Sequence, residues 1–405
     1  MRRAALLALL LLAAVPAAAA ELPFHGFLEV AAGARVVEDD TARDDVLLEE
    51  ARFQLDFLRD GDRGSLAFRA DFVYDGVDRE SRVEVREANV VLLPWESVDV
   101  KAGRQVLTWG TGDLIFLNDL FPKDWQSFFL GRDDEYLKKP GDALRATWFG
   151  GWASLDLAWT PVFEPDGYLT GERLSYWNAG AERRFGPRDP QLDPDEPAKT
   201  LGNGTLAGRL YGNFSGWETA LYGYRGRYGQ PKGFDPGAGA AFFPRMEAWG
   251  ASVRGTVAGG VANAEAAWYR SLDDPGGDDP NLPNDEVRAL VGYAREVLPE
   301  QSLAFQAYLE RALSFPAPGF TDQNRWWLTA RYTGFFLQQN LTVSLFAFYS
   351  PTEDDAYLRP KAAYKLSDEI LLTLGANVFL GAHDDTFFGQ FEDNTNLYAR
   401  VRYSF

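Results

Sequence analysis

The chain contains no cysteine and only two histidines among its 405 residues. The absence of cysteine excludes thiol catalysis, disulfide bonds and cysteine-ligated zinc sites. No run in the body of the chain approaches the roughly 20 consecutive apolar residues that a membrane-spanning helix needs. Basic residues are scarce, 40 against 59 acidic ones, and nucleic acid is not an expected partner because phosphate binding requires clustered Lys and Arg. The sequence predicts no catalytic residue, no cofactor and no metal site.

The first twenty residues have the composition of a secretory signal peptide. Arg2 and Arg3 precede an apolar stretch over 4–14, and small residues at 18–20 form a cleavage site before Glu21. We therefore expect residues 1–20 to be removed and residues 21–405 to form a single domain.

Beyond Glu21, apolar and polar residues alternate with a period of two, which indicates strands with one apolar and one polar face. Phe68, Ala70 and Phe72, for example, alternate with Arg69 and Asp71. These segments run for roughly 9–14 residues, longer than the ~5–6 of soluble strands and suited to a tilted membrane-spanning strand.

The last such segment alternates from Asn396 and ends on Phe405. An aromatic last residue with apolar residues at every second position before it resembles the C-terminal signature of Gram-negative outer-membrane barrels. The resemblance implies that the barrel-assembly machinery recognises Phe405.

Short and long connections between these segments alternate. Eight tight turns lie near 61–62, 94–96, 150–151, 214–216, 259–260, 299–300, 337–339 and 367–368. Nine long polar loops cover 38–45, 75–81, 107–141, 161–202, 229–243, 272–285, 314–323, 351–355 and 382–394. A further segment at 176–186 could be a strand, but counting it as loop preserves the alternation and leaves both termini on one side.

The pattern predicts an all-β protein, a transmembrane antiparallel β-barrel of about 18 strands with long extracellular loops and short periplasmic turns. A secreted β-sandwich or propeller also alternates, but its connections would be short at both ends.

Alternation also assigns charged side chains to the inner face of this barrel, where basic residues outnumber acidic ones. The basic set is Arg52, Arg69, Arg86, Lys101, Arg145, Arg209, Arg254, Arg288, Arg325, Arg331, Arg359, Lys361, Arg400 and Arg402, together with Arg82, Arg225 and Lys365. The acidic set is Glu50, Asp56, Asp71, Glu84, Asp99, Asp156, Glu265, Glu286 and Glu310. A basic conduit favours anionic or sugar-acid solutes. The alternative is that Arg and Glu ladders pair and merely keep the interior wet.

The third long loop, 107–141, is too apolar for a solvated loop, with Phe116, Phe128 and Phe129 among its residues. We expect it to fold into the barrel and narrow it. The candidates for the constriction are Asp119, Lys123, Asp124, Arg132, Asp133 and Lys138. The alternative is a structural plug that only stabilises the wall.

Gly103-Arg104-Gln105, followed by Trp109-Gly110 and by Asn118-Asp119 with Pro122 and Asp124, resembles outer-membrane porin-like barrels, including alginate-export-like families. The architecture is also similar to that of substrate-specific eighteen-stranded porins. The resemblance implies an outer-membrane channel for passive diffusion of small hydrophilic, anionic solutes. Its partners would be outer-membrane lipid, lipopolysaccharide and small polar or anionic solutes, and a homo-oligomer is left open.

Two other functions are compatible with parts of the pattern. An exporter of an acidic polysaccharide follows if the alginate-export resemblance holds. An outer-membrane hydrolase would need a catalytic set, for which His383-Asp384-Asp385 is the nearest match, but no serine motif accompanies it.

Overall fold

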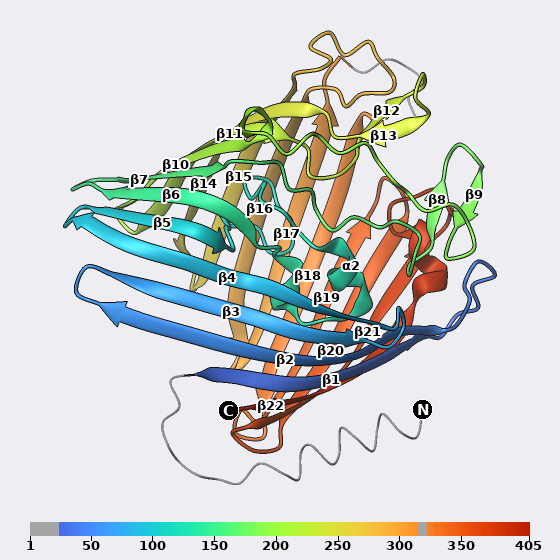
Figure 1. Cartoon of the computed structure of the whole chain (residues 1–405), viewed down its shortest axis with the longest axis horizontal. Helices are drawn as coiled ribbons and strands as arrows, with labels where there is room; N and C mark the ends of the chain where they lie inside the picture. The colour runs from blue at the N-terminus through green and yellow to red at the C-terminus, as the bar shows by residue number, and fades with distance from the viewer. Residues whose placement is uncertain (1–23, 315–321) are drawn as a thin grey trace.

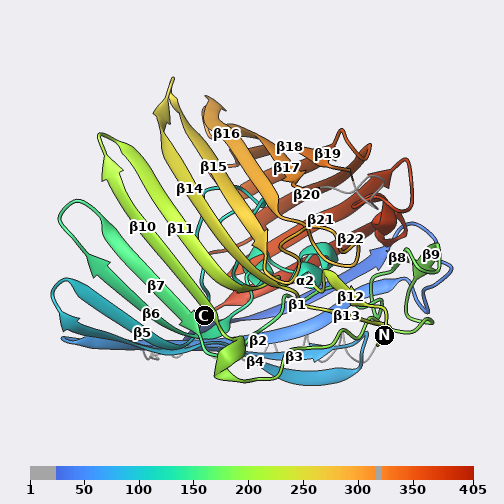
Figure 2. The same ribbon diagram turned by 90° about the horizontal axis from the view of Figure 1, so that it is seen from above.

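The computed structural model describes residues 24–314 and 322–405, and the predicted signal peptide lies outside them. Within this part of the chain, eighteen strands form one antiparallel sheet, and β1 pairs with β22 to close it into a barrel (Figures 1 and 2). The wall strands are β1 (His25–Arg35), β2 (Val46–Gly61), β3 (Gly64–Asp75), β4 (Glu80–Trp95), β5 (Val98–Gln105), β6 (Gly141–Phe149), β7 (Ser154–Thr160), β10 (Thr205–Phe214), β11 (Trp217–Arg227), β14 (Arg245–Val257), β15 (Gly260–Ser271), β16 (Glu286–Leu298), β17 (Gln301–Ala312), β18 (Asn324–Phe336), β19 (Leu341–Ser350), β20 (Asp355–Lys365), β21 (Ile370–Gly381) and β22 (Asn396–Ser404). The predicted all-β barrel of eighteen strands is confirmed.

The remaining elements lie in the long loops. Two small hairpins, β8–β9 (Tyr176–Asn178 and Arg183–Phe185) and β12–β13 (Gly233–Asp235 and Ala240–Phe242), form sheets of their own. The segment at 176–186 therefore belongs to a loop, as the alternation of connections required. The helices are α2 (Trp125–Leu130), η1 (Asp134–Leu137), η2 (Leu201–Asn203) and η3 (Gly389–Asn394). None of the helices in the described ranges is both long and apolar enough to span a membrane.

The two ends of the barrel differ in their connections. Each of the eight predicted tight turns joins two neighbouring wall strands at one end of the barrel. The first strand begins and the last strand ends at this same end. Left-handed backbone makes these turns tight: Ser215 and Gly216 have φ of 53° and 85°, and Ala258 and Gly259 have φ of 47° and 75°. The long loops emerge at the opposite end, so we refer to the short-turn end and the long-loop end.

The outer face of the wall is apolar. On β3, Phe68 and Phe72 are exposed on the outside, whereas Arg69 and Asp71 point inwards and pair with polar groups of β2. Exposed tryptophans gather towards the two ends of the strands, Trp95 and Trp152 beside short turns and Trp249 towards the long-loop end. An apolar band between aromatic girdles is the surface expected to face lipid.

The lipid-facing band generates the first prediction. Val291 lies near the middle of β16 on the outer face and is 59 % exposed, so Val291→Arg should destabilise the barrel by about 2–4 kcal/mol in a bilayer. Ser302→Arg places the same side chain on the inner face of β17 and should leave stability nearly unchanged, since that face is polar. Reversible urea unfolding in lipid vesicles measures both, and equal losses would contradict the assignment of faces.

Candidate functional site

Residues 106–140, which we call the inward loop, leave the wall after β5 and lie inside the barrel before returning as β6. Figure 1 shows α2 of this loop within the ring of strands. The Asp113 backbone forms two hydrogen bonds with the Gln306 side chain on β17, of 2.7 and 2.9 Å. On the other side, Asn377 of β21 and Asn396 of β22 donate to the Phe129 carbonyl. The loop therefore extends through the lumen and contacts the wall at β17 and again at β21 and β22.

A buried carboxylate on β15 fixes the first part of the inward loop. Glu265 is 4 % exposed and accepts hydrogen bonds from the backbone N–H groups of Thr111 and Gly112 and from the Asn118 side chain, the last two at 2.8 Å. Gly110 allows this approach because its φ is 83° and a Cβ there would lie 3.2 Å from the Glu265 carboxylate. The segment 109–112, which begins with the Trp-Gly pair of the porin-like motif, thus surrounds the Glu265 carboxylate with backbone N–H donors.

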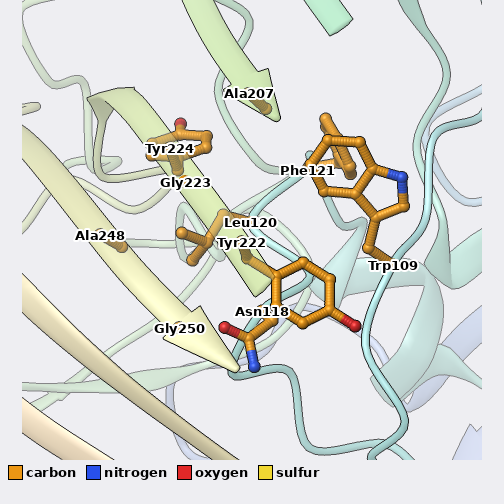
Figure 3. A pocket seen from close by; sticks show the side chains of 10 residues that line it. All are labelled: Trp109, Asn118, Leu120, Phe121, Ala207, Tyr222, Gly223, Tyr224, Ala248 and Gly250. Atoms are coloured by element: carbon orange, nitrogen blue, oxygen red, sulfur yellow. The ribbon is translucent and has the colours of Figure 1, made fainter. Parts of the chain in front are cut away.

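The same part of the loop packs tightly against β10, β11 and β14. Figure 3 shows Trp109, Asn118 and Phe121 of the loop facing Tyr222 and Gly250 of the wall. The rings of Trp109 and Phe121 meet edge to face at 4.9 Å, and the remaining space is only about 10 Å³. The loop and the wall therefore leave almost no free space between them at this contact.

The second part of the loop fills the opposite side with an aromatic core. Phe128 and Phe129 of α2 pack against Tyr357, Phe379 and other rings that point inwards from β19–β21 and η3. Tyr357 and Phe379 stack in parallel with centroids 4.5 Å apart. The apolar side chains Phe128, Phe129 and Leu130 of α2 are thereby buried.

Acidic side chains of the inward loop meet basic side chains of the wall. Asp113 pairs with Arg331 at 2.6 Å, and Asp134 pairs with both Arg359 at 2.9 Å and Lys361 at 2.7 Å. Asp133 pairs with Arg400 at 2.9 Å, and Glu135 lies 3.5 Å from Arg402. The loop carries its own countercharges to this basic face.

Most other basic side chains on the inner face pair with acidic ones of the wall or, for Arg325, of the long loop after β19. The pairs are Arg52 with Asp71 and Glu84, Arg69 with Asp56 and Glu87, Lys101 with Glu87, Arg145 and Arg209 with Asp156, Arg288 with Glu286 and Glu310, Arg325 with Glu353, and Arg402 with Glu29. The interior is a network of ion pairs rather than a simple row of free cations.

Four predicted side chains have no carboxylate partner among the described residues. Arg254, which lines the lumen, and Lys365, at the end of β20, form neither a side-chain hydrogen bond nor an ion pair. Arg86 donates only to the carbonyls of Glu135 and Lys138, and Lys138 donates only to Thr108. One further residue was assigned to the wrong face. Arg225 lies outside, opposite the exposed Leu206, because Tyr222 and Tyr224 occupy the inner positions of β11.

The six constriction candidates divide into two groups. Asp119 and Lys123 form a buried pair at 3.0 Å, the Asp124 side chain caps α2, and Arg132 binds Glu50 on β2. These four hold the shape of the loop and its attachment to the wall. Asp133 and Lys138 remain partly exposed to the lumen.

Three acids of the loop that contact the basic wall were missed as candidates: Asp113, Asp134 and Glu135. The signal in the sequence was the run Asp133-Asp134-Glu135 within a loop expected to enter a basic lumen. The individual partners could not be found from the sequence, since Asp113 and Arg331 are 218 positions apart.

The loop carboxylates differ in acidity because their surroundings differ. Burial raises the pKa of Asp134, but Arg359 and Lys361 more than reverse this, and the pKa lies well below its usual range. Burial keeps the pKa of Asp113 raised despite Arg331, and it keeps the pKa of Glu135 raised despite Arg402. Asp113 and Glu135 therefore protonate first on acidification.

Open space remains on both sides of the inward loop. At the long-loop end, a cavity of about 440 Å³ is lined mainly by aromatic and apolar side chains such as Trp125 and Trp327, with Lys232 and Arg325 among the polar ones. At the short-turn end, a cavity of about 610 Å³ is lined by Arg209, Glu218 and Arg254. In the part of the chain that the structure covers, no three His, Cys, Asp or Glu side chains are grouped to hold a metal ion.

No protein-family model and no curated protein matches the sequence. Solved structures do match over nearly the whole length. OccAB3 of Acinetobacter baumannii is 8 % identical with a TM-score of 0.57, covering 94 % of this chain and 98 % of its own. Pseudomonas aeruginosa OccK11 (OpdR) and OccD3 (OpdP) are each 10 % identical with TM-scores of 0.54 and 0.53, covering 94 % of this chain and 95 % and 90 % of theirs. The chain thus has the fold of the outer-membrane porins, and the expected resemblance to porin-like barrels is confirmed at that level.

Close packing of the loop on β14 generates the second prediction. A Cβ at Gly250 would lie 1.8 Å from the Asn118 side-chain oxygen, so Gly250→Val should push Asn118 away from Glu265 and loosen the inward loop. Chymotrypsin should then cleave at Phe116 or Phe121, which the unmodified protein should resist. Gly208→Ala on β10 is the control, because its Cβ meets nothing closer than 3.4 Å. Equal protease resistance of the two variants would show that the contact does not hold the loop.

Proposed function

We propose that this protein is an outer-membrane channel through which small hydrophilic solutes, preferentially anions, diffuse passively. The barrel supports this proposal by its apolar outer band, its charged interior and the two cavities on either side of the inward loop. The fold shared with outer-membrane porins supports the location in the outer membrane.

The preference for anions rests on one observation, the sharing of carboxylates by pairs of cations. Asp134 serves both Arg359 and Lys361, and Asp156 serves both Arg145 and Arg209. Each of these two pairs of cations retains one more positive charge than its shared carboxylate, whereas Arg52, Arg69 and Arg288 elsewhere on the wall each pair with two carboxylates. A surplus positive charge in a confined aqueous path lowers the barrier for anions.

Arg254 adds to this surplus in the short-turn cavity, where Glu218 on the neighbouring strand partly offsets it. The solute would therefore meet Lys361 and Lys138 beside the inward loop and Arg209 and Arg254 below it. Lipopolysaccharide and outer-membrane lipid around the barrel, and association with further copies, belong to the same proposal.

Recognition by the barrel-assembly machinery through Phe405 is also part of the proposal. The Phe405 backbone pairs with Gly26 through bonds of 3.1 and 3.0 Å, and its ring stacks on Phe53 at 6.0 Å. The last residue thus lies at the seam between the first and last strands, where assembly of the barrel must finish.

The two other functions gain no support from a specific contact. Asp384, the residue beside His383, is paired with Arg184 at 2.9 Å. The lumen is divided by the inward loop and its aromatic core, and nothing in it favours a polysaccharide chain over a small solute.

The reversal potential in a planar bilayer under a KCl gradient tests the preference, and it should indicate anions. Asp134→Asn removes the shared carboxylate, and since an exposed charge contributes about 0.2–1 kcal/mol, the Cl⁻/K⁺ permeability ratio should rise about 1.5- to fivefold. Asp368→Asn in a short turn is the control and should change nothing. A cation preference of the unmodified protein would overturn the anionic proposal.

The raised pKa values of Asp113 and Glu135 predict a dependence on pH. As the pH falls, Asp113 and Glu135 lose their charge at a higher pH than ordinary carboxyls, whose pKa is about 4. Arg331 and Arg402 then lose countercharge, so the anion preference should rise between neutral pH and about pH 4–5. The double variant Asp113→Asn, Glu135→Gln should show the acid value already at pH 7. A preference that falls on acidification would contradict this reading of the loop.

A further inference from the structure

The wall of the barrel has a step between β4 and β5. Residues Glu80–Leu92 of β4 pair with β3, but only Ala88–Trp95 pair with β5. The chain leaves the wall after Gln105 to form the inward loop, so among the described strands none lies beside residues 80–87 on that side. Figure 1 shows β4 continuing well beyond the end of β5.

A cavity of about 780 Å³ lies at this step and reaches both faces of the wall. Its lining includes Val83 and Ala88, which belong to the outer face, and Arg52 and Tyr136, which lie inside. Val83 is 60 % exposed and stands opposite the exposed Phe72 of β3. The step is therefore an opening in the wall, backed on the inside by Tyr136 of the inward loop, at a level where the outer surface is still apolar.

An unpaired strand edge at this level requires polar partners, because backbone groups cannot be left unsatisfied in hydrocarbon. Arg104 supplies one, donating from Nε to the Val85 carbonyl at 2.8 Å. The other edge groups need water or the polar part of a ligand.

The charge available to such a ligand is positive. The acids of the opening are already engaged: Glu84 by Arg52 and Arg82, Asp142 by Arg104, and Asp124 by its own helix. In contrast, Arg86 and Lys139 donate only to backbone carbonyls. Two cations without carboxylate partners thus line an opening whose outer rim, at Val83 and Ala88, is apolar.

We propose that this opening binds the phosphorylated headgroup of lipopolysaccharide from the outer leaflet. The phosphate would contact Arg86 and Lys139, and the acyl chains would lie against the outer face near Val83 and Phe72. Phosphate is a strong acceptor for charged donors, and an adjoining apolar rim distinguishes a lipid phosphate from a free one. This inference rests on the outer-membrane location in the proposed function but not on the selectivity of the channel.

The absence of native cysteine allows a direct test with single reporters. Val83→Cys and Val291→Cys are matched, since both side chains lie on the outer face and are 60 % and 59 % exposed. In vesicles of phosphatidylethanolamine, a membrane-impermeant maleimide should label the cysteine at 83 and leave the one at 291 unmodified. Including lipopolysaccharide in the bilayer should protect position 83, and 10 mM inorganic phosphate should not.

Binding is measured separately as retention of lipopolysaccharide by the purified full chain in native mass spectrometry. The double variant Arg86→Gln, Lys139→Gln should retain it roughly tenfold less, because two charge-assisted hydrogen bonds are lost. Lys365→Gln, on the inner face near a short turn, is the control and should retain it as the unmodified protein does. Lipopolysaccharide without its phosphates should bind no better than phosphatidylethanolamine.

If the cysteine at 83 is not labelled in phosphatidylethanolamine vesicles, the proposed opening in the wall is refuted. If lipopolysaccharide does not prevent its labelling, lipopolysaccharide is refuted as the ligand. Protection by inorganic phosphate would also overturn the lipid. The ion conductance of the unmodified protein separates the two proposals. If the protein conducts ions but the cysteine at 83 is not labelled, only this inference is refuted. If lipopolysaccharide prevents labelling at 83 but the protein does not conduct ions, only the channel is refuted.

Discussion

The Glu265 carboxylate, buried on the inner face of β15, determines where the inward loop lies, and much of the interior depends on it. It has no cation beside it; its charge is satisfied by backbone N–H groups and the Asn118 amide of the loop. Removing a buried charge from water is costly unless such donors surround it. The Glu265 carboxylate and the loop therefore stabilise each other, because the carboxylate needs hydrogen-bond donors and the N–H groups of the loop need an acceptor.

Once the loop is held there, its later segments meet different side chains of the same stretch of wall. α2 faces the inward rings of β19–β21, whereas the acidic segment after it, Asp133–Glu135, faces the basic side chains of β20 and β22. The sharing of single carboxylates by two cations is a consequence of this geometry. The acidic run contacts the bases of β20 and β22 but not Arg86 or Lys138, which have no carboxylate partner among the described residues, so a positive surplus remains beside the loop.

The period-two pattern was sufficient to predict the strands, their number and the inner or outer position of most charged residues, because a strand exposes alternate residues to lipid and lumen. It failed at Arg225, where tyrosines rather than charged residues point inwards. It also did not identify Phe379 or Tyr357 as interior residues, although Asn377 and Arg359 share their parity, because attention to charged side chains alone passes over inward rings. The contacts between loop and wall join residues hundreds of positions apart, and strand parity has no bearing on which of them meet.

The inward loop and the step in the wall have one cause. Strand β5 ends at Gln105 and is about half as long as β4. The chain therefore enters the lumen at Gln105, and residues 80–87 of β4 have no neighbouring strand on that side among the described strands. The loop compensates from within: Tyr136 lies under the guanidinium of Arg52, and Arg86 donates to the carbonyls of Glu135 and Lys138. These contacts cover the inner side of the edge but not its outer side, where Val83 remains exposed. The short β5 that sends the loop into the lumen thus leaves edge groups of β4 that need a polar partner, which the proposed lipopolysaccharide headgroup would supply.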